Sequence, residues 1–344
     1  MGLVRFLLAI SVVIYHSARP HRGLTLVDGL AAVKFFFMIS GFYMALILNG
    51  KYTSYSSFII NRFLKLFPTY WIVLMLCLVY APSIHFQELP VPLSIYYIFS
   101  NLFIVGSNFA AIIVQQAGDF TISSLAVPLE IQKTTWNYLY LSPIWSLSIE
   151  IGFYFLAPFL LAHGYFKRKM FGMFCVSLLV NLFLVINHAW RPPWNYNFLA
   201  PILYLFMLGA LGWRLYHSSF FKTYYHWSLG LASLLSLCAY IVGYQFMPSH
   251  INLYVIPRAV EPASLGIILF AIGIPFIFEF SKRNKIDRFF GDLSYPLYIG
   301  HFFIIHYFPY LKQWNPLIGS LLLAIVLDVC VIKTIDRYRA RLVK

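Results

Sequence analysis

Long apolar runs recur along the whole chain, and they constrain the fold more than any other feature of the sequence. Each run is about 20 residues long, which is the length an α-helix needs to cross the hydrocarbon core of a membrane. The runs are continuous and do not alternate between apolar and polar residues, so they disfavour a β-barrel. They lie near residues 3–18, 30–49, 66–83, 94–114, 144–162, 171–188, 197–213, 227–246, 258–279, 290–309 and 317–335.

The composition agrees with a membrane protein. Charged residues make up only 10% of the 344 residues and hydrophobic ones 61%, whereas soluble domains carry about a quarter charged residues. An ordinary soluble protein and a disordered chain are therefore excluded. We expect an all-α polytopic bundle over residues 1–344, forming a single membrane-embedded domain with no soluble domain.

The net charge of +14 reflects orientation in the membrane and not nucleic-acid binding. Most of the lysines and arginines fall in loops that can share one side, and such loops are cytosolic. This pattern places both termini in the cytosol, which requires an even number of spans, although eleven runs are present. The run at 94–114 contains Asn101, Ser107 and Asn108, so we expect it to be short or re-entrant, leaving about ten crossing helices. The alternative is that residues 116–130 also cross, which gives twelve.

The first run carries two chemically useful side chains. Arg5 and His16 are eleven residues apart, so they lie on nearly the same helix face about 16 Å apart. An imidazole can take a proton from a hydroxyl near neutral pH, which makes His16 a candidate base. The alternative is an Arg5 that sets topology and a His16 that caps the helix.

Further candidate residues stand at the ends of other runs. Arg62 and Lys65 are spaced i, i+3 before Pro68 and suit phosphates, or else lipid headgroups. Glu150 lies near the start of a helix, where it either caps that helix or binds hydroxyls, and Trp145 beside it suits a sugar face. Near the C-terminus, Asp292 or Ser294 is expected to cap a helix that carries His301 further along.

Read in order, these segments resemble the integral-membrane O-acyltransferases called acyltransferase family 3, which modify surface polysaccharides and related glycans. The resemblance rests on five motifs: Arg5 and His16 in the first helix, FFMISGF at 36–42, the basic pair with a proline in NRFLKLFPTYW, the WSLSIE segment at 145–150, and GDLSYPLYIGH at 291–301. Two positions depart from the family pattern, because Lys65 stands where arginine is common and Lys34 precedes the Phe-rich run.

The resemblance implies that an acyl group, expected to be acetyl, passes from acyl-CoA to a sugar hydroxyl. His16 would be the general base and Glu150 would orient the acceptor or the histidine, while a route through an acyl-histidine stays open. The phosphates of the donor would lie on Arg5, Arg62 and Lys65. The expected substrate-binding residues are Trp145, Ser40, Tyr295 and His301, with Ser40 or Tyr295 as an oxyanion donor.

The same resemblance implies a multi-pass protein of the bacterial inner membrane that needs acyl-CoA, a glycan or lipid-linked acceptor and membrane lipids, but no metal and no nucleic acid. A second class is a membrane transporter or flippase for a glycan or lipid, which would use Glu261, Asp328 and His301 as buried polar groups. Transporters often contain inverted repeats, and the sequence shows no such symmetry.

Overall fold

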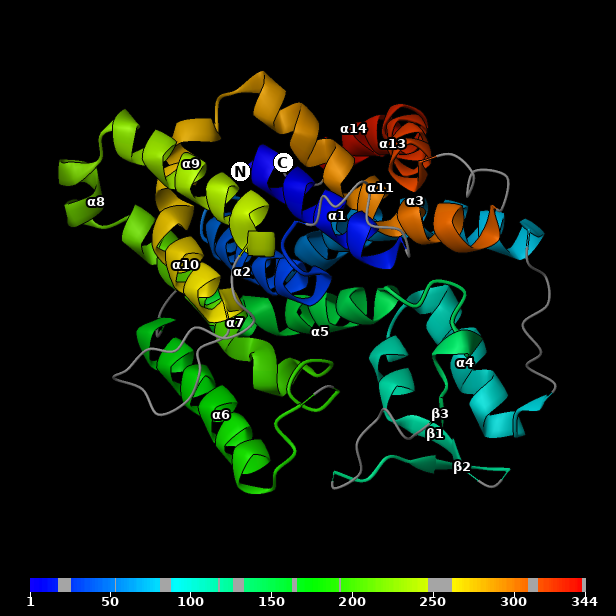
Figure 1. Ribbon diagram of the computed structural model, residues 1–344. Coiled ribbons are helices and arrows are strands. Elements are labelled where there is room, and N and C mark those ends of the chain that lie inside the picture. Colours follow the sequence, from blue (N-terminus) through cyan, green and yellow to red (C-terminus); the bar gives the residue numbers. More distant parts are fainter. Residues whose placement is uncertain are drawn as a thin grey trace. The chain divides into compact units, whose positions relative to one another are not determined.

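The computed structural model describes ten stretches of the chain, which form two compact units (Figure 1). Unit 1 contains Met1–Leu46 and Leu208–Lys333, and unit 2 contains Ile47–Met207 and Thr334–Lys344. Each unit is described by itself. The described residues are 1–17, 26–52, 54–80, 88–116, 118–125, 133–162, 166–191, 193–246, 262–308 and 315–341.

Unit 1 is a helical bundle. Helix α1 packs against α11 and α13, α11 packs against α13, and α9 packs against α10; Figure 1 shows α1 running beside α11. The core where α1 meets α11 and α13 is built from Ala9, Val13, Leu297 and Ala324. The helices of this unit are α1 (Gly2–His16), α2 (Gly29–Leu48), the second half of α7 (Leu199–Tyr216), α8 (Ser219–Tyr224), α9 (Trp227–Gly243), a 3-10 turn (Tyr244–Phe246), α10 (Pro262–Ser281), α11 (Lys285–Tyr307), α13 (Pro316–Leu327) and a π-helical turn (Asp328–Ile332).

Short polar side chains fix where these helices begin. Asp28 accepts hydrogen bonds from the first-turn N–H groups of α2, and Asn284 does the same for α11. Such caps satisfy donors that the helix itself cannot. The prediction that Asp292 or Ser294 caps a helix is wrong, because both lie inside α11, which begins at Lys285.

Unit 2 combines helices with a small sheet. In it α5 packs against α3 and α6, and a 3-10 turn (Ser107–Ala111) packs against α5. Its elements are α3 (Tyr55–Tyr80), α4 (Val91–Phe103), that 3-10 turn, β1 (Ile113–Gln116), β2 (Asp119–Ile122), β3 (Lys133–Thr134), a second 3-10 turn (Trp136–Tyr138), α5 (Ile144–Leu161), α6 (Phe166–Ile186), the first half of α7, and α14 (Lys333–Arg341).

The segment between α4 and α5 explains why the apolar run at 94–114 is weak. Helix α4 has only 13 residues and ends at Phe103, before Ile104, whose φ is 67°, so it is short, as the sequence predicts. Its Asn101 side chain donates to the Tyr97 and Tyr138 carbonyls and accepts from the Tyr140 N–H. This polar residue therefore ties the returning chain to α4.

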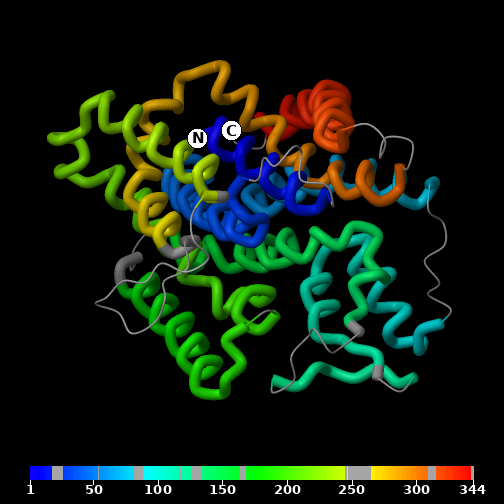
Figure 2. Tube along the Cα trace, in the orientation of Figure 1, coloured from blue at the N-terminus to red at the C-terminus, as the bar shows by residue number. Residues whose placement is uncertain are grey.

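Strands β1 (Ile113–Gln116) and β2 (Asp119–Ile122) pair in an antiparallel arrangement, so the expectation of a further helix over 116–130 is wrong for the part that the structure describes. The strand order is β2-β1-β3, and Val114 lies opposite both Thr121 and Thr134. Figure 2 traces both strands after α4. This small sheet is the one departure from the all-α class among the described residues.

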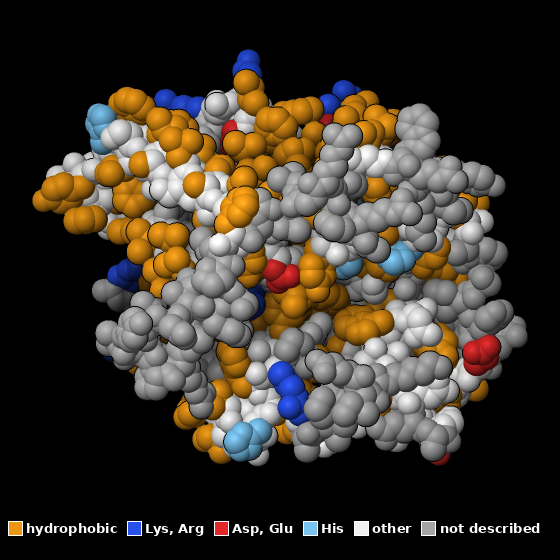
Figure 3. Space-filling model, in the orientation of Figure 1, with side chains coloured by type: hydrophobic (Ala, Val, Ile, Leu, Met, Phe, Trp, Pro, Cys, Tyr) orange, Lys and Arg blue, Asp and Glu red, His pale blue; other side chains and the backbone are white. Residues whose placement is uncertain are grey.

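Length and composition identify six helices that are able to cross a membrane, within α2, α3, α5, α6, α7 and the run from Pro316 to Arg341. Four shorter apolar helices accompany them, and charged side chains are sparse among the described residues on the face in Figure 3. The chain is therefore an all-α multi-pass membrane protein with a small added sheet. The count of about ten crossings and the cytosolic position of both termini stay predictions.

One glycine in unit 1 permits a close helix contact that predicts a stability change. A Cβ built on Gly209 of α7 would lie 1.9 Å from the Met38 carbonyl oxygen of α2, whereas one built on Gly172 of α6 meets nothing within 4 Å. We expect Gly209→Ala to destabilise the protein by about 1–3 kcal/mol through overpacking. Gly172→Ala is the matched control and should be neutral or stabilising by up to about 1 kcal/mol.

Thermal unfolding of the purified protein measures both effects. Equal unfolding temperatures for the two variants would contradict the close contact between α7 and α2.

Candidate functional site

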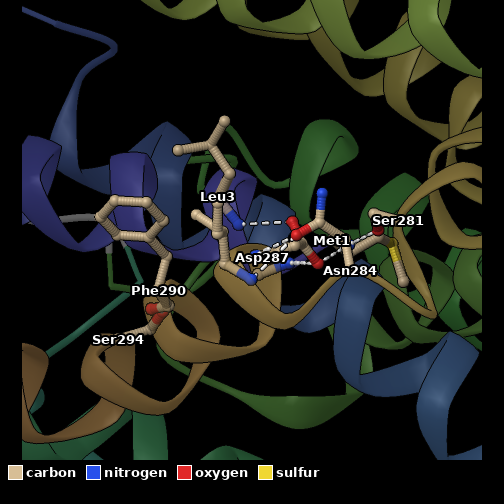
Figure 4. A network of polar contacts seen from close by, with 9 residues as sticks. Met1, Leu3, Ser281, Asn284, Asp287, Phe290 and Ser294 are labelled. Carbon is tan, nitrogen blue, oxygen red and sulfur yellow. Dashed lines mark hydrogen bonds and ion pairs between the residues drawn. The ribbon is translucent and has the colours of Figure 1, made fainter.

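The N-terminus of α1 is capped by a carboxylate from another helix. The N–H groups of Gly2 and Leu3 donate to the two Asp287 carboxylate oxygens, at 2.8 and 2.9 Å. The Met1 ammonium also lies 2.8 Å from Asp287 and donates to the Ser281 hydroxyl, as Figure 4 shows. First-turn N–H groups need partners and carry partial positive charge, so Asp287 fixes the start of α1 on α11.

Glycines allow the two helices to touch at this end. A Cβ on Gly2 would lie 1.6 Å from the Asp287 carbonyl oxygen, and one on Gly291 would lie 3.1 Å from the Gly2 Cα. A larger residue at position 2 would therefore push the helices apart. From this contact onward, Val13 and Leu297 pack in the buried core, so α1 and α11 stay together along their length.

The equal spacing along the two helices brings two histidines together. Gly2 and His16 are fourteen residues apart in α1, and Asp287 and His301 are fourteen apart in α11. Each interval rises about 21 Å along the helix axis, so two parallel helices joined at Gly2 and Asp287 meet again at the histidines. His301 Nε2 lies 3.3 Å from His16 Nδ1.

The hydrogen bonds around this pair assign the tautomers of neutral imidazoles. His301 Nδ1 lies 2.5 Å from the Tyr298 carbonyl oxygen, and a carbonyl only accepts, so Nδ1 carries the proton. The Nε2 atom of His301 is then an acceptor. His16 Nδ1 must therefore carry its own proton and donate it to His301 Nε2 and to the Val12 carbonyl oxygen at 3.0 Å.

This arrangement leaves the Nε2 atom of His16 with a lone pair. His301 is fully buried, with 0% of its surface exposed, while His16 is half-buried at the last residue of α1. No described residue is hydrogen-bonded to His16 Nε2. His16 can thus accept a proton at Nε2 while His301 holds its ring in place.

In unit 2, two residues singled out in the sequence belong to one connected cluster. The Tyr154 hydroxyl donates to Glu150 Oε1 at 2.6 Å, and the Arg62 guanidinium carbon lies 5.9 Å from the centre of the Tyr154 ring. Glu150 is in the second turn of α5, and the first turn holds no acidic residue. The capping alternative for Glu150 is therefore wrong, and its carboxylate is directed to Tyr154.

The basic pair lies within a helix and not in the loop before one. Helix α3 begins at Tyr55, earlier than the predicted span, so Arg62, Lys65 and Pro68 all belong to it. Arg62 is buried, and its Nη2 atom donates to Asn61 Oδ1 at 2.8 Å; Lys65 is half-buried one turn later.

The remaining predicted residues fall in one unit or the other. Arg5 is in the second turn of α1, Ser40 is buried in α2, and Tyr295 is half-buried in α11, all in unit 1. Trp145 in unit 2 has its ring 4.8 Å from that of Tyr196. The predicted roles of these residues, and the predicted meeting of Glu150 with His16, stay predictions.

Of the three polar residues named for the transporter alternative, the structure describes Asp328 and His301. Asp328 is buried in the π-helical turn and pairs with Lys333 at 3.1 Å, which is a structural partnership. Glu261 lies outside the described residues. Within the described stretches no group of three metal-binding side chains occurs.

Sequence reasoning missed Asp287, Tyr154 and Asn61, and also Arg339, whose Nη2 atom lies 3.3 Å from Asn61 Oδ1. Tyr154 follows Glu150 by four residues, a spacing that places both on one helix face, so it could have been found. Asp287 and Arg339 had no local signal, because each acts on a segment almost 300 residues away in the sequence.

Comparison with known proteins identifies the type of domain. A family model described as an acyltransferase domain matches residues 1–335. An uncharacterized protein of Aquifex aeolicus (strain VF5) is 23% identical over 209 residues, which cover 58% of this chain and 86% of that protein. No solved structure matches the chain significantly.

The Asp287 cap predicts a stability change. We expect Asp287→Ala to lower the free energy of unfolding by about 1–2 kcal/mol, because the two N–H groups at the start of α1 lose their acceptors. Asp287→Asn keeps one acceptor oxygen and should fall between wild type and alanine. Thermal unfolding of the purified protein is the measurement.

The neighbouring Arg288 is exposed, so Arg288→Ala is the control and should change stability by less than about 0.5 kcal/mol. If the alanine variants at 287 and 288 unfold at the same temperature, Asp287 does not anchor α1.

Proposed function

The chain belongs to acyltransferase family 3, and on that premise we propose that it transfers an acetyl group from acetyl-CoA to a sugar hydroxyl of a surface polysaccharide or other glycan. The observation that carries the proposal is the Nε2 lone pair of His16, left available by the hydrogen bond from its Nδ1 to His301. A general base needs such a lone pair beside the hydroxyl that it deprotonates.

In the proposed reaction the acceptor hydroxyl gives its proton to His16 Nε2 while its oxygen attacks the thioester carbonyl carbon. The tetrahedral intermediate then breaks its carbon–sulfur bond, and the CoA thiolate takes the proton back from His16. The products are the O-acetylated sugar and CoA thiol. During the step His16 carries a positive charge, which the His301 lone pair and the Val12 carbonyl stabilise at Nδ1.

Basic residues supply the proposed donor site. Acetyl-CoA is made in the cytosol and carries phosphates, and the basic loops of a membrane protein are cytosolic. Arg5, Arg62 and Lys65 are the proposed phosphate ligands, since charge-assisted hydrogen bonds to phosphate are strong. The proposed location is the bacterial inner membrane, with the pantetheine arm directed along α1 toward His16.

Glu150 and Tyr154 are proposed to contact the acceptor. The carboxylate and the phenol are already joined by a short hydrogen bond, a combination that suits sugar hydroxyls, and Trp145 offers an aromatic face for the sugar ring. Ser40 or Tyr295 is the proposed donor to the oxyanion of the tetrahedral intermediate.

The base assignment predicts that His16→Ala abolishes transfer, with a fall of at least about 10²-fold in kcat, because general base catalysis is lost. Purified protein in nanodiscs is supplied with acetyl-CoA and glycan, and both CoA thiol release and the mass gain of the glycan are followed. His306→Ala, a change at an exposed histidine of α11, is the control.

Near-normal transfer by His16→Ala would show that His16 is not the base. Glycan movement by the wild type without thiol release would instead indicate transport.

His301 has a proposed role distinct from substrate contact, because both of its ring nitrogens already have partners. We expect it to position His16, so His301→Phe should lower kcat about 10- to 100-fold while the KM for acetyl-CoA changes little. His301→Gln restores an acceptor oxygen and should recover part of kcat. Steady-state kinetics in both substrates test this split.

A substrate-binding role for His301 would instead raise the KM of a substrate in both variants. Equal losses of kcat in the Phe and Gln variants would exclude the positioning role.

A further inference from the structure

Two arginines from distant parts of the chain converge on one amide in unit 2. Asn61 Oδ1 accepts from Arg62 Nη2 at 2.8 Å and from Arg339 Nη2 at 3.3 Å. The Asn61 amide nitrogen in turn donates to the Arg339 carbonyl oxygen at 3.4 Å. Asn61 therefore fixes both the backbone and the side chain of Arg339, which belongs to α14, beside Arg62 of α3.

Both guanidinium groups keep buried donors unused. The Nε atoms of Arg62 and Arg339 are buried and have no hydrogen-bond partner among the described residues. Arg62 is only 8% exposed. A buried donor without an acceptor costs free energy, and more so when the group is charged, so this arrangement needs an explanation.

The charges of the two arginines and their neighbours also need an explanation. Asp336 pairs with Arg339 and is the one carboxylate bonded to either guanidinium within the described part of the chain. Arg62 has a neutral amide and the rings of Phe58 and Tyr154 as its neighbours. Among the groups bonded to the two guanidiniums, Asp336 thus supplies one negative charge against two positive ones, while Glu150 nearby is bonded to Tyr154.

We propose that Arg62, Asn61 and Arg339 form a phosphate clamp, in which a phosphate group of the acyl-CoA donor accepts hydrogen bonds from both guanidinium groups. A phosphate offers several oxygens in the geometry that arginine forks match, and it neutralises the excess charge. In this proposal the ligand approaches from the side of Arg339, whose side chain keeps 18% of its surface exposed. The choice of CoA as the source of the phosphate rests on the proposed function.

Arg339 is a new part of the donor site. It follows the end of the family match at residue 335 and lies in the basic C-terminal segment, whose charge the positive-inside rule explains without any ligand. The hydrogen bonds to Asn61 separate Arg339 from Arg337 and Arg341 of the same helix, which are exposed.

The test is direct binding of CoA to the purified full-length protein. We expect Arg339→Gln to raise the Kd for CoA about 10-fold or more, as the loss of a charge-assisted hydrogen bond predicts. Arg337→Gln makes the same charge change on the same helix at an exposed site, and should leave the Kd within about twofold of wild type. A Kd that is equal in the two variants would overturn the clamp.

A second variant covers the case in which Arg339→Gln fails to fold. Arg339→Lys keeps the charge and the long side chain but lacks the planar fork, so it should bind CoA more weakly than wild type, with a Kd raised by less than about 10-fold. If the glutamine variant does not fold and a folded Arg339→Lys variant binds CoA with wild-type affinity, the planar fork of Arg339 is not needed, and the clamp is overturned.

CoA without its 3′-phosphate identifies which phosphate is held. If Arg339→Gln no longer weakens binding of this analogue, the clamp holds the 3′-phosphate; if it weakens both ligands equally, the clamp holds the diphosphate, and both results support the proposal. Loss of co-purified anionic lipid from Arg339→Gln, with unchanged CoA affinity, would assign the cluster to a lipid headgroup and overturn the proposal.

The same variants separate this proposal from the proposed function. CoA binding that depends on Arg339 without any acyl transfer by the wild type would support the clamp and contradict the transferase. Normal acyl transfer and unchanged CoA affinity in Arg339→Gln would support the transferase and contradict the clamp.

Discussion

The contact between α1 and α11 is the interaction on which the candidate chemistry depends. Asp287 holds the first N–H groups of α1, and His301 holds the imidazole at the last residue of the same helix. Because the two intervals are equal in length, α1 is fixed to one partner helix at both ends. A change in the register of either helix would break one of these contacts, so the position of His16 is coupled to the packing of the whole pair.

This coupling has a physical consequence for α1. A helix of 15 residues is short and has little stability of its own, and much of its surface is apolar. Its order comes from the core around Ala9 and Val13 and from the Asp287 cap. His16, the proposed base, therefore belongs to a helix whose conformation is set by α11. A general base must be held in a fixed position, and this packing provides that.

The sequence predicts the long apolar helices well, since a run of hydrophobic residues marks each of them, whereas the short helices α8 and α14 have no such run. It predicts the interruption at 94–114 through Asn101, although not that the chain then forms strands, because a three-stranded sheet of two- to four-residue strands leaves no periodic pattern. The start of α3 was missed because its first turn is polar and because Asn61, Arg62 and Lys65 then interrupt the apolar residues, so a search for long apolar runs begins too late.

Candidate site residues stand out in the sequence where the chemistry is rare in a membrane and go unnoticed where it is common. His16, Arg62 and Glu150 stand out because ionisable groups are scarce in apolar helices. Arg339 is one of several basic residues in the C-terminal segment, and Asp287 is one of several polar residues around the start of α11, so neither is distinguished by its neighbours. Their roles depend on pairing with Asn61 and with Gly2, which only the folded chain brings about.

The choice of a histidine as the partner of His16 fits the cost of charge in this environment. A carboxylate in place of the fully buried His301 would be a permanent charge, and it would be neutralised most readily by holding a proton on His16, which would then cease to be a base. A neutral imidazole costs less to bury and still offers a lone pair to Nδ1–H of His16. In the proposed reaction, charge develops at the pair only while His16 holds the proton of the acceptor, so His301 would stabilise the reacting state and not the resting protein.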